Sequence, residues 1–496
     1  MIKTFKRIGL IFALLQLILS IVVVALMIKF NILPSFYIFV IVFVLTLFFL
    51  ITGLFFISKS RFRVATAAVF SVIMCVVLSV ASFKYIIPAM DTLEKITTKK
   101  QTYLATYHIL TKADDEASKP EDVKEYYIGV EKSHDFDAML KALEKIASEF
   151  EHVMNVVPYD DYSAMWTGFI ERSETGAILM ETNYYNIYRE YYEEQGDNIA
   201  NYVKILGDIQ VEMAVENVKE DLPEIENKKE ITRDPFVMYI SGIDVEGSIN
   251  QRSRSDVNII MAVNPNTKKI VLATVPRDAY VKLPGISGDS YDKLTHAAIY
   301  GNNDCNVSIE TLEQNIYNGI NIDYWTKVNF TSLKKIVDAL GGIEVYSEYA
   351  FTSTFSGKRV SFNKGMNQMD GEKALVFCRE RVTVPGEEPQ RGRNQLEVIK
   401  GIFNKATSPS IISNYNDVLD EISDCILTSM ATEEITSLVK MQLDDGASWS
   451  FETVSVGVEY EYNYCYSIPG IKLCVGIVDE ASRTAAVAKI NEVLAK

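Results

Sequence analysis

Hydrophobic and polar positions divide the chain into an apolar beginning and a mixed remainder. Three long stretches carry no charged residue: 8–28, 36–57 and 64–83. Because a helix rises about 1.5 Å per residue, each stretch is about 30 Å long as a helix and matches the apolar core of a bilayer. The pattern predicts three transmembrane helices within residues 1–90.

Basic residues around these stretches predict their orientation. They gather before the first stretch and between the second and third: Lys3, Lys6, Arg7, Lys59, Arg61 and Arg63. The other two ends carry only Lys29 and Lys84. Because basic residues stay on the cytoplasmic side, we expect the N-terminus in the cytoplasm and the chain from about residue 88 outside it, at the cell membrane. Its chemistry then proceeds without cytosolic ATP.

After the apolar stretches, changing periodicity predicts α/β structure in two units. Polar residues 91–119 suggest a helical stalk and linker, and residues 120–215 alternate between strand and helix patterns. A charged linker follows at 216–234. The expected division is three transmembrane helices (1–90), a stalk with a small accessory α/β domain (91–230), a larger α/β sandwich with a central mixed sheet (231–445), and a strand–helix extension of it (446–496).

The larger unit begins with three strand patterns. The second and third, joined by an Asn-Pro-Asn-Thr turn, predict a β-hairpin over 256–275. Helix patterns follow at 307–318, 331–340, 370–376, about 391–406 and 479–495. Gly341 and Gly342 mark the end of the second of these.

Tyrosines crowd one expected helix of the accessory domain: Tyr184, Tyr185, Tyr188, Tyr191 and Tyr192. They suggest either a surface that stacks on sugars or a half-buried helix face, and the second interpretation is favoured.

Composition excludes several classes of protein. The net charge is −16, and residues 91–496 hold 41 basic against 65 acidic residues, which disfavours nucleic acid as a partner. The six cysteines include no CxxC pair and form no disulfide framework, although Cys465 and Cys474 leave a pairing open. The four histidines have no metal-ligand spacing, His296 being expected as a packed polar residue, and no P-loop, GxGxxG or GxSxG motif is present.

Charged residues collect at the expected strand ends of the larger unit. Asp244 follows the first strand, Arg254 and Asp256 open the second, and Arg277 and Asp278 follow the third. The two carboxylates of Asp244 and Asp256 flank adjacent strands, so they suit Mg²⁺ shared with a phosphate.

Further cations lie later in the chain. Arg379 and Arg381 are two residues apart and share one side of an extended segment, while Arg391 and Gln395 are four apart and share a helix face. Guanidinium groups fork onto phosphate oxygens. Together with the two carboxylates they predict a site for one pyrophosphate and its cation, although each residue alone is as well explained by a turn, a cap or a surface charge.

These segments resemble the LytR-CpsA-Psr (LCP) family. The resemblance covers roughly 235–410 and rests on SGID, RSDVNIIMAVNPNTKKIVLATVPRDAYVKLPG, YDKLTHAAIYG, DALGGIEV, ALVFCRER and RGRNQ, in the family's order. Three transmembrane helices and an extra domain in front are similar to the CpsA-type branch, which handles capsule and other cell-wall polymers.

The resemblance implies a phosphotransferase that moves a glycopolymer, capsular or teichoic-acid-like, from undecaprenyl pyrophosphate onto peptidoglycan. By the same resemblance, Asp244 and Asp256 would hold Mg²⁺. The pyrophosphate would be bound by Arg254, Arg277, Arg379, Arg381, Arg391 and Gln395. Arg254 and Arg277 would take part in catalysis, and Asp278 would act as the base or orient Arg277.

The resemblance also implies an apolar groove for the polyprenyl tail. The candidate lining residues are Leu333, Ile336, Val337, Leu340, Leu396, Ile399 and Phe403, for each of which core packing is the competing role. One departure is VPGEEPQ, with Glu387 and Glu388, where the family often has an acidic Gly-Asp loop.

Two other functions fit the same sequence. One is a non-catalytic polyprenyl-pyrophosphate-binding regulator that sets polymer length or assists capsule-synthesis proteins. The other is a pyrophosphatase acting on the lipid carrier. The polymer, the acceptor sugar, the oligomeric state and the role of the accessory domain stay open.

Overall fold

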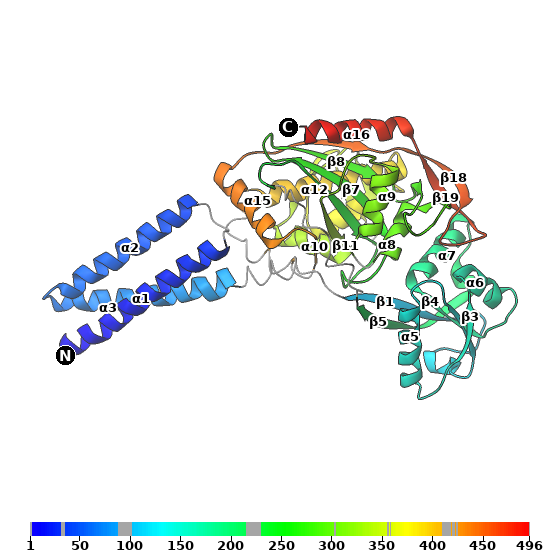
Figure 1. Cartoon of the computed structure of the whole chain (residues 1–496), viewed down its shortest axis with the longest axis horizontal. Helices are drawn as coiled ribbons and strands as arrows, with labels where there is room; N and C mark the ends of the chain where they lie inside the picture. Colours follow the sequence, from blue (N-terminus) through cyan, green and yellow to red (C-terminus); the bar gives the residue numbers. More distant parts are fainter. Residues whose placement is uncertain are drawn as a thin grey trace.

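The computed structural model describes residues 2–30, 35–87, 102–214, 230–301, 304–354, 357, 359–408, 418, 422 and 425–495. In Figure 1 three long helices lie together at one end, a small domain lies at the other, and a larger domain lies between them.

The three predicted membrane segments are helices long and apolar enough to cross a bilayer. They are α1 (Ile2–Phe30), α2 (Ser35–Ile57) and α3 (Arg61–Val80), and α3 continues into the π-helical turn Ala81–Ile86. Where the helices touch, they pack through Ala13, Phe56, Val64 and Ala67. Most of their other large apolar side chains are exposed, as expected of a surface that faces lipid.

The accessory domain is a five-stranded sheet of order β3-β2-β4-β1-β5. Its strands are β1 (Thr102–Lys112), β2 (Tyr127–Glu131), β3 (Asn155–Tyr159), β4 (Ala177–Glu181) and β5 (Val203–Ala214). Helix α5 (Phe136–Glu149) packs on one face through one apolar cluster, and α6 (Tyr162–Ile170) and α7 (Thr182–Glu194) pack on the other.

The prediction of a helical stalk over 91–119 is wrong for part of its length. Residues 88–101 lie outside the described residues, but β1 is a strand that pairs with both β4 and β5. Its sequence, TYLATYHILTK, alternates buried and half-buried positions in its first half and is rich in β-branched and aromatic residues. The accessory domain therefore begins at Thr102, before the expected start at residue 120.

The larger domain is built on a mixed six-stranded sheet of order β16-β11-β6-β7-β8-β17. The predicted hairpin is β7 (Ser255–Asn264) and β8 (Lys269–Val275), and β7 also pairs antiparallel with β6 (Phe236–Ile243). Strand β11 (Tyr324–Asn329) runs parallel to β6, β17 (Ser450–Ser455) runs parallel to β8, and β16 (Leu427–Thr428) closes the other edge.

Helices cover both faces of this sheet (Figure 1). Alternate residues of β8 point to opposite layers: Val271 and Ala273 pack with α9 (Asn306–Asn315) and α16 (Glu480–Leu494), and Ile270 and Leu272 pack with the other layer. That other layer comprises α10 (Phe330–Ala339), α11 (Gly371–Arg379), α12 (Glu387–Ala406) and α15 (Thr432–Asp445). The short helix α8 (Ala297–Tyr300) precedes α9.

Short pairs of strands form separate two-stranded sheets outside the main sheet. They are β9 (Tyr280–Val281) with β10 (Asp292–Lys293), β12 (Ile343–Ser347) with β15 (Gly365–Met369), β13 (Phe351–Ser353) with β14 (Val360–Phe362), and β18 (Val458–Tyr464) with β19 (Lys472–Val478). The predicted tail strand and final helix correspond to β17 and α16, which complete the main sheet and its helical layer. The β18–β19 hairpin between them was not predicted.

The accessory domain and the larger domain meet at a buried ion cluster. The Arg252 guanidinium lies 2.6 Å from an Asp135 carboxylate oxygen and 3.1 Å from one of Glu181, and its side chain is 5% exposed. Asn183 donates to the Arg252 carbonyl. Burial alone would raise the pKa of Glu181, but Arg252 outweighs it and lowers the pKa to about 2.

The tyrosines of α7 belong to this junction. Tyr184 and Tyr188 are buried, and the Tyr184 hydroxyl lies 3.3 Å from that of Tyr300 in the larger domain. Tyr188 stacks on Trp166. The half-buried helix face is therefore the role the structure gives them, because their rings fill the space between the two domains.

Replacing Arg252 is expected to loosen the domain junction strongly. Arg252→Met leaves two buried carboxylates without their cation, which costs about 3–5 kcal/mol, whereas Arg172→Met removes an exposed pair and costs at most about 1 kcal/mol. The measurement is the urea midpoint of unfolding. Because the pKa of Glu181 is depressed from 4.5, the stabilisation is full above pH 4.5 and is lost as the pH falls towards 2. If the difference in urea midpoint between the wild type and Arg252→Met stayed constant from pH 4.5 to pH 2, the assignment of Arg252 as the stabilising partner of Glu181 would be contradicted.

Candidate functional site

Three strand ends bring the predicted site residues to one edge of the main sheet. Asp244 follows β6, Arg254 and Asp256 stand at the start of β7, and Arg277 follows β8. Because β6, β7 and β8 are antiparallel neighbours, the end of β6, the start of β7 and the end of β8 share one edge. We call it the site edge.

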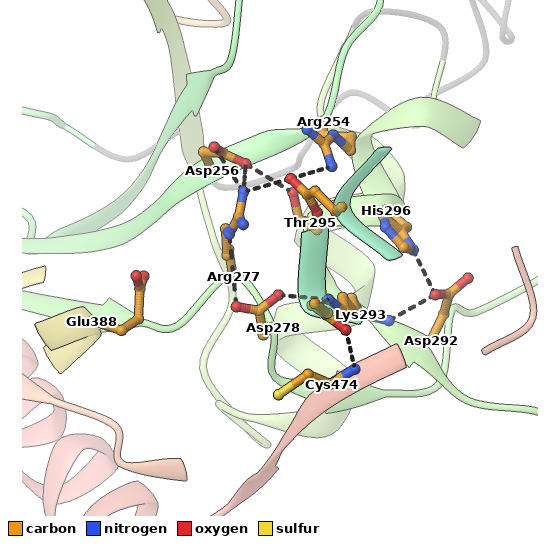
Figure 2. A network of polar contacts seen from close by, with 12 residues as sticks. Arg254, Asp256, Arg277, Asp278, Asp292, Lys293, Thr295, His296, Glu388 and Cys474 are labelled. Carbon is orange, nitrogen blue, oxygen red and sulfur yellow. Dashed lines mark hydrogen bonds and ion pairs between the residues drawn. The ribbon is translucent and has the colours of Figure 1, made fainter. Parts of the chain in front are cut away.

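Ion pairs connect these residues in a network, part of which is shown in Figure 2. The Nη1 of Arg277 lies 3.0 Å from each carboxylate oxygen of Asp256, and the Nη2 of Arg254 lies 3.5 Å from Asp244. Burial, followed by the negative charge of Asp256, raises the pKa of Asp244. The pKa of Asp256 is lowered, because Arg277 and Arg254 outweigh the effect of its burial.

The later cations reach the same place from two helices. Arg379 is the last residue of α11, which begins where the Asp370 carboxylate accepts a hydrogen bond from the Lys373 amide at 2.8 Å. The prediction that Arg379 and Arg381 share an extended segment is therefore wrong for Arg379, because this capped helix extends three residues beyond the predicted end at 376. Both side chains nevertheless line the same cavity.

Helix α12 begins earlier than predicted, at Glu387. Pro389 fits its first turn, where no intrahelical amide donor is needed. Glu388 then stands one turn before Arg391, and its carboxylate lies 2.5 Å from the Arg391 Nη2. Burial raises the pKa of Glu388, and Arg391 offsets part of the shift. The VPGEEPQ segment thus places one acid directly beside a predicted phosphate ligand.

A cavity of about 510 Å³ opens at the site edge and runs between the sheet and helices α10–α12. The lining residues of α12 show its polarity: Arg391, Gln395, Val398, Ile399 and Ile402 lie within about 100° of helix rotation and over about 16 Å of length. The lining of β6 changes in the same way, from Ile240 to Asp244. One end of the cavity is therefore charged, and the other is apolar.

Four predicted arginines and both predicted metal ligands line the charged end: Arg277, Arg379, Arg381, Arg391, Asp244 and Asp256, with Gln395 beside them. Arg254 and Asp278 lie behind this lining. Arg254 is 1% exposed, and the two oxygens of Asp278 face Lys293 at 3.1 Å and Arg277 at 3.7 Å. Arg254 itself contacts the carboxylates of Glu190 and Asp244 and is not among the residues that line the cavity.

The seven predicted lipid-groove residues divide into two groups. Leu333, Ile336 and Ile399 line the cavity, whereas Val337 and Leu340 pack in the core beneath β12. Leu396 and Phe403 pack against the sheet. On α12 these two residues lie about 40–60° of rotation away from Ile399, on the far side from Gln395. The apolar stripes are wider than the cavity, so only one edge of each stripe reaches it.

The accessory domain supplies site residues that the sequence did not identify. Arg189, Glu190 and Glu193 of α7 line the cavity, and Glu190 contacts both Arg254 and Arg277. Burial would raise the pKa of Glu190, but Arg254 and Arg277 outweigh it and hold the pKa far below its usual range. One signal was present: Glu190 is three residues after the buried Ile187, so it lies near the apolar face of the helix.

The carboxylate pair fits a hard cation with outside ligands. Asp244 and Asp256 line the same end of the cavity, and after burial the negative charge of Asp256 is the next cause that raises the pKa of Asp244; a dication between the two acids would offset that repulsion. Among the described residues no group of three or more His, Cys, Asp or Glu side chains could hold a metal.

Two smaller predictions about polar residues can be compared with the structure. His296 is buried with its Nδ1 2.6 Å from Asp292, as expected of a packed polar residue. Cys465 and Cys474, whose pairing was left open, are both free thiols.

Comparison with known proteins identifies the same family as the resemblance in the sequence. The LytR_cpsA_psr family matches residues 203–474. The polyisoprenyl-teichoic acid–peptidoglycan teichoic acid transferase TagU of Enterococcus faecalis is 34% identical over 226 residues, which cover 45% of this chain and 69% of the relative. For TagU of Bacillus subtilis the identity is 32%, covering 41% and 62% of the two chains, and for TagT of Bacillus subtilis it is 30%, covering 45% and 71%.

Solved structures are similar over about half of this chain. B. subtilis TagV gives a TM-score of 0.44 at 24% identity, covering 53% of this chain and 98% of that one. TagT bound to LI-WTA gives 0.43 at 23% identity, covering 54% and 94%. With more than half of its residues matched by the family, the chain belongs to the LytR_cpsA_psr family.

Proposed function

We propose that this protein is a membrane-anchored phosphotransferase that moves a glycopolymer from an undecaprenyl-pyrophosphate carrier onto peptidoglycan. One observation carries the proposal: a single cavity has a cluster of four guanidinium groups at one end and apolar side chains between sheet and helices at the other. A polyprenyl diphosphate has the same two parts. The relatives named as teichoic acid transferases support the same substrate class.

The charged end suits a diphosphate because its cations are permanent. Arg277, Arg379, Arg381 and Arg391 keep their charge at any physiological pH and present paired N–H donors. Carboxylates hold two of them in place, since Arg277 contacts Asp256 and Arg391 contacts Glu388. Such prearranged donors stabilise the charge that develops on phosphate oxygens as the reaction proceeds.

The energy for the transfer comes from the pyrophosphate bond of the donor. A hydroxyl oxygen of the acceptor sugar attacks the phosphorus that carries the glycan, and the bond from that phosphorus to the bridging oxygen breaks. Undecaprenyl phosphate leaves with the bridging oxygen, the glycan keeps its phosphate in a new phosphodiester, and the hydroxyl proton passes to a base. No nucleotide is required. Asp278 lies behind Arg277 and contacts it and Lys293, so we assign it to positioning Arg277.

We propose Mg²⁺ as the cation that Asp244 and Asp256 would hold. When bound, it would neutralise charge on the diphosphate. Replacing Asp244 with Asn is expected to raise the Mg²⁺ concentration for half-maximal transfer at least tenfold, because the site loses one of its two carboxylates. A chelator should abolish transfer by the wild type, and Mg²⁺ should restore it. A chelated protein that transfers at the full rate would disprove the metal assignment.

The location follows from the three apolar helices and their flanking charges. We propose that the N-terminus is cytoplasmic and that both α/β domains lie outside the cell membrane, where the lipid carrier presents its glycan and peptidoglycan is found. The polymer is capsular or teichoic-acid-like, and capsule-synthesis proteins are proposed partners.

The test is reconstitution of the full chain in lipid nanodiscs with Mg²⁺, lipid-linked glycopolymer and peptidoglycan fragments. The expected product is glycan joined to peptidoglycan through a phosphodiester, detected by mass spectrometry. Release of phosphate or glycan phosphate without acceptor would indicate a pyrophosphatase. Tight binding of the lipid with no turnover would indicate a regulator. Either result would refute the transferase function.

A further inference from the structure

Helix α7 of the accessory domain places one carboxylate between two buried cations of the site edge. The Oε1 of Glu190 lies 2.9 Å from the Nη1 of Arg254 and 3.4 Å from the Nη1 of Arg277. A single oxygen therefore bridges two guanidinium groups that belong to the other domain.

The two guanidinium groups need such a bridge. Burial disfavours the charged form of Arg254, and the nearby Arg277 also repels it. Glu190 lies closer to Arg254, at 2.9 Å, than Asp244 does, at 3.5 Å. Without this carboxylate, two like charges would face each other in a largely buried place, and mutual repulsion would push the less buried partner, Arg277, out of position.

The contacts of Arg277 leave part of its guanidinium for a ligand. In the described part of the chain its carboxylate contacts go to Nη1, from Asp256 and Glu190, and to Nε, from Asp278. Asp256 and Glu190 thus hold Nη1, Asp278 lies 3.7 Å from Nε, and Nη2 is the atom we assign to a phosphate oxygen. Glu190 is the only one of the three that comes from the accessory domain.

We propose that Glu190 is a positioning residue of the transfer reaction, through which the accessory domain completes the diphosphate-binding site by holding Arg254 and Arg277 side by side. This inference rests on the proposed function, since it assigns the accessory domain a part in the same reaction.

Joining the domains does not by itself require Glu190. The junction has its own ion cluster, in which Arg252 pairs with Asp135 and Glu181, and its own apolar contacts around Tyr184 and Tyr188. Glu190 instead lines the cavity. Its location thus connects it to ligand binding more directly than to domain adhesion.

The experiment compares charge with shape at this position in the full chain. Glu190→Gln keeps the shape and removes the charge, Glu190→Asp keeps the charge on a shorter side chain, and Glu174→Gln makes the same chemical change at an ion pair with Arg172 elsewhere in the accessory domain. Two quantities are measured: the Kd for inorganic pyrophosphate by calorimetry, and KM and kcat for transfer from the lipid-linked polymer. Melting temperature and gel filtration report folding.

We expect Glu190→Gln to raise the Kd for pyrophosphate and the KM for the donor at least tenfold. Glu190→Asp should lie between this variant and the wild type, and Glu174→Gln should match the wild type. Unchanged or tighter pyrophosphate binding by Glu190→Gln would overturn the inference, because Glu190 would then be a bystander or a competitor of the substrate. Binding closer to wild type for Gln than for Asp would also overturn it, by showing that only shape matters.

Two further experimental outcomes also test the role of Glu190. Should Glu190→Gln fail to fold, Glu190→Asp alone must bind pyrophosphate at least threefold more weakly than the wild type, and equal affinity would contradict the inference. Should the wild type bind pyrophosphate yet transfer no polymer, the proposed transferase function fails, while the pyrophosphate affinities still decide the role of Glu190.

Discussion

Arg277→Ala is expected to reduce glycopolymer transfer about 1,000-fold. Removing one preorganised donor from an anionic transition state costs about 10²–10³ in rate, and this residue also holds Asp256 and Glu190 through its Nη1. Its loss therefore removes a phosphate ligand and leaves two carboxylates facing the substrate with one cation fewer. Arg277→Lys should retain intermediate activity, because it keeps the charge but loses the planar fork.

The comparison for this variant is Arg233→Ala. Arg233 is exposed and pairs with Glu230 on the surface of the larger domain, so its removal should leave transfer within twofold of the wild type. Circular dichroism and melting curves establish that each variant is folded. Transfer by folded Arg277→Ala at the wild-type rate would contradict the assignment of this arginine to the site.

Ile399→Trp is expected to weaken binding at the apolar end of the cavity without changing binding at the charged end. The larger ring should fill space beside Val398 and Ile402, so the prenyl tail loses contact with the wall. Losing about 100 Å² of apolar burial costs about 2.5 kcal/mol at about 25 cal/mol per Å². We therefore expect undecaprenyl phosphate to bind about 70-fold more weakly, whereas inorganic pyrophosphate should bind as it does to the wild type.

The matched variant for this prediction is Asn404→Trp, which adds the same ring to an exposed position of α12. It should bind both ligands normally. Equal weakening of lipid and pyrophosphate by Ile399→Trp would mean that the helix had shifted, and unchanged lipid binding would show that the tail lies elsewhere.

The strand ends of the larger domain could be predicted because local patterns define them. The apolar runs of β7 and β8 and the turn between them fix the hairpin, and an antiparallel hairpin next to β6 necessarily brings Asp244, Asp256 and Arg277 to one edge. The same reasoning identified Arg391 and Gln395, since four residues make about one helical turn.

Sequence reasoning failed where a position depends on another domain. Arg254 looks like any site-edge cation in the sequence, yet it is buried and pairs with Glu190, 64 positions earlier in the chain. No local periodicity encodes which helix of one domain packs on which edge of another. Likewise Val337 and Ile336 are adjacent members of one apolar stripe, and only the packing under β12 decides that Val337 is core and Ile336 is cavity wall.

The β1 strand illustrates a third limit. Its first residues follow a long polar segment, which favours a linker, but pairing with β4 and β5 outweighs that local preference. Long-range pairing of this kind is set by the partners' sequences, so a stretch considered alone is easily misassigned.

The most direct test of the central claim is a crystal structure of the full chain with undecaprenyl pyrophosphate. We predict that the diphosphate lies within hydrogen-bonding distance of Arg277, Arg379, Arg381 and Arg391, and that the prenyl chain runs past Ile399 between the sheet and α10–α12. A diphosphate bound away from these arginines, or a tail outside the cavity, would contradict the proposed function.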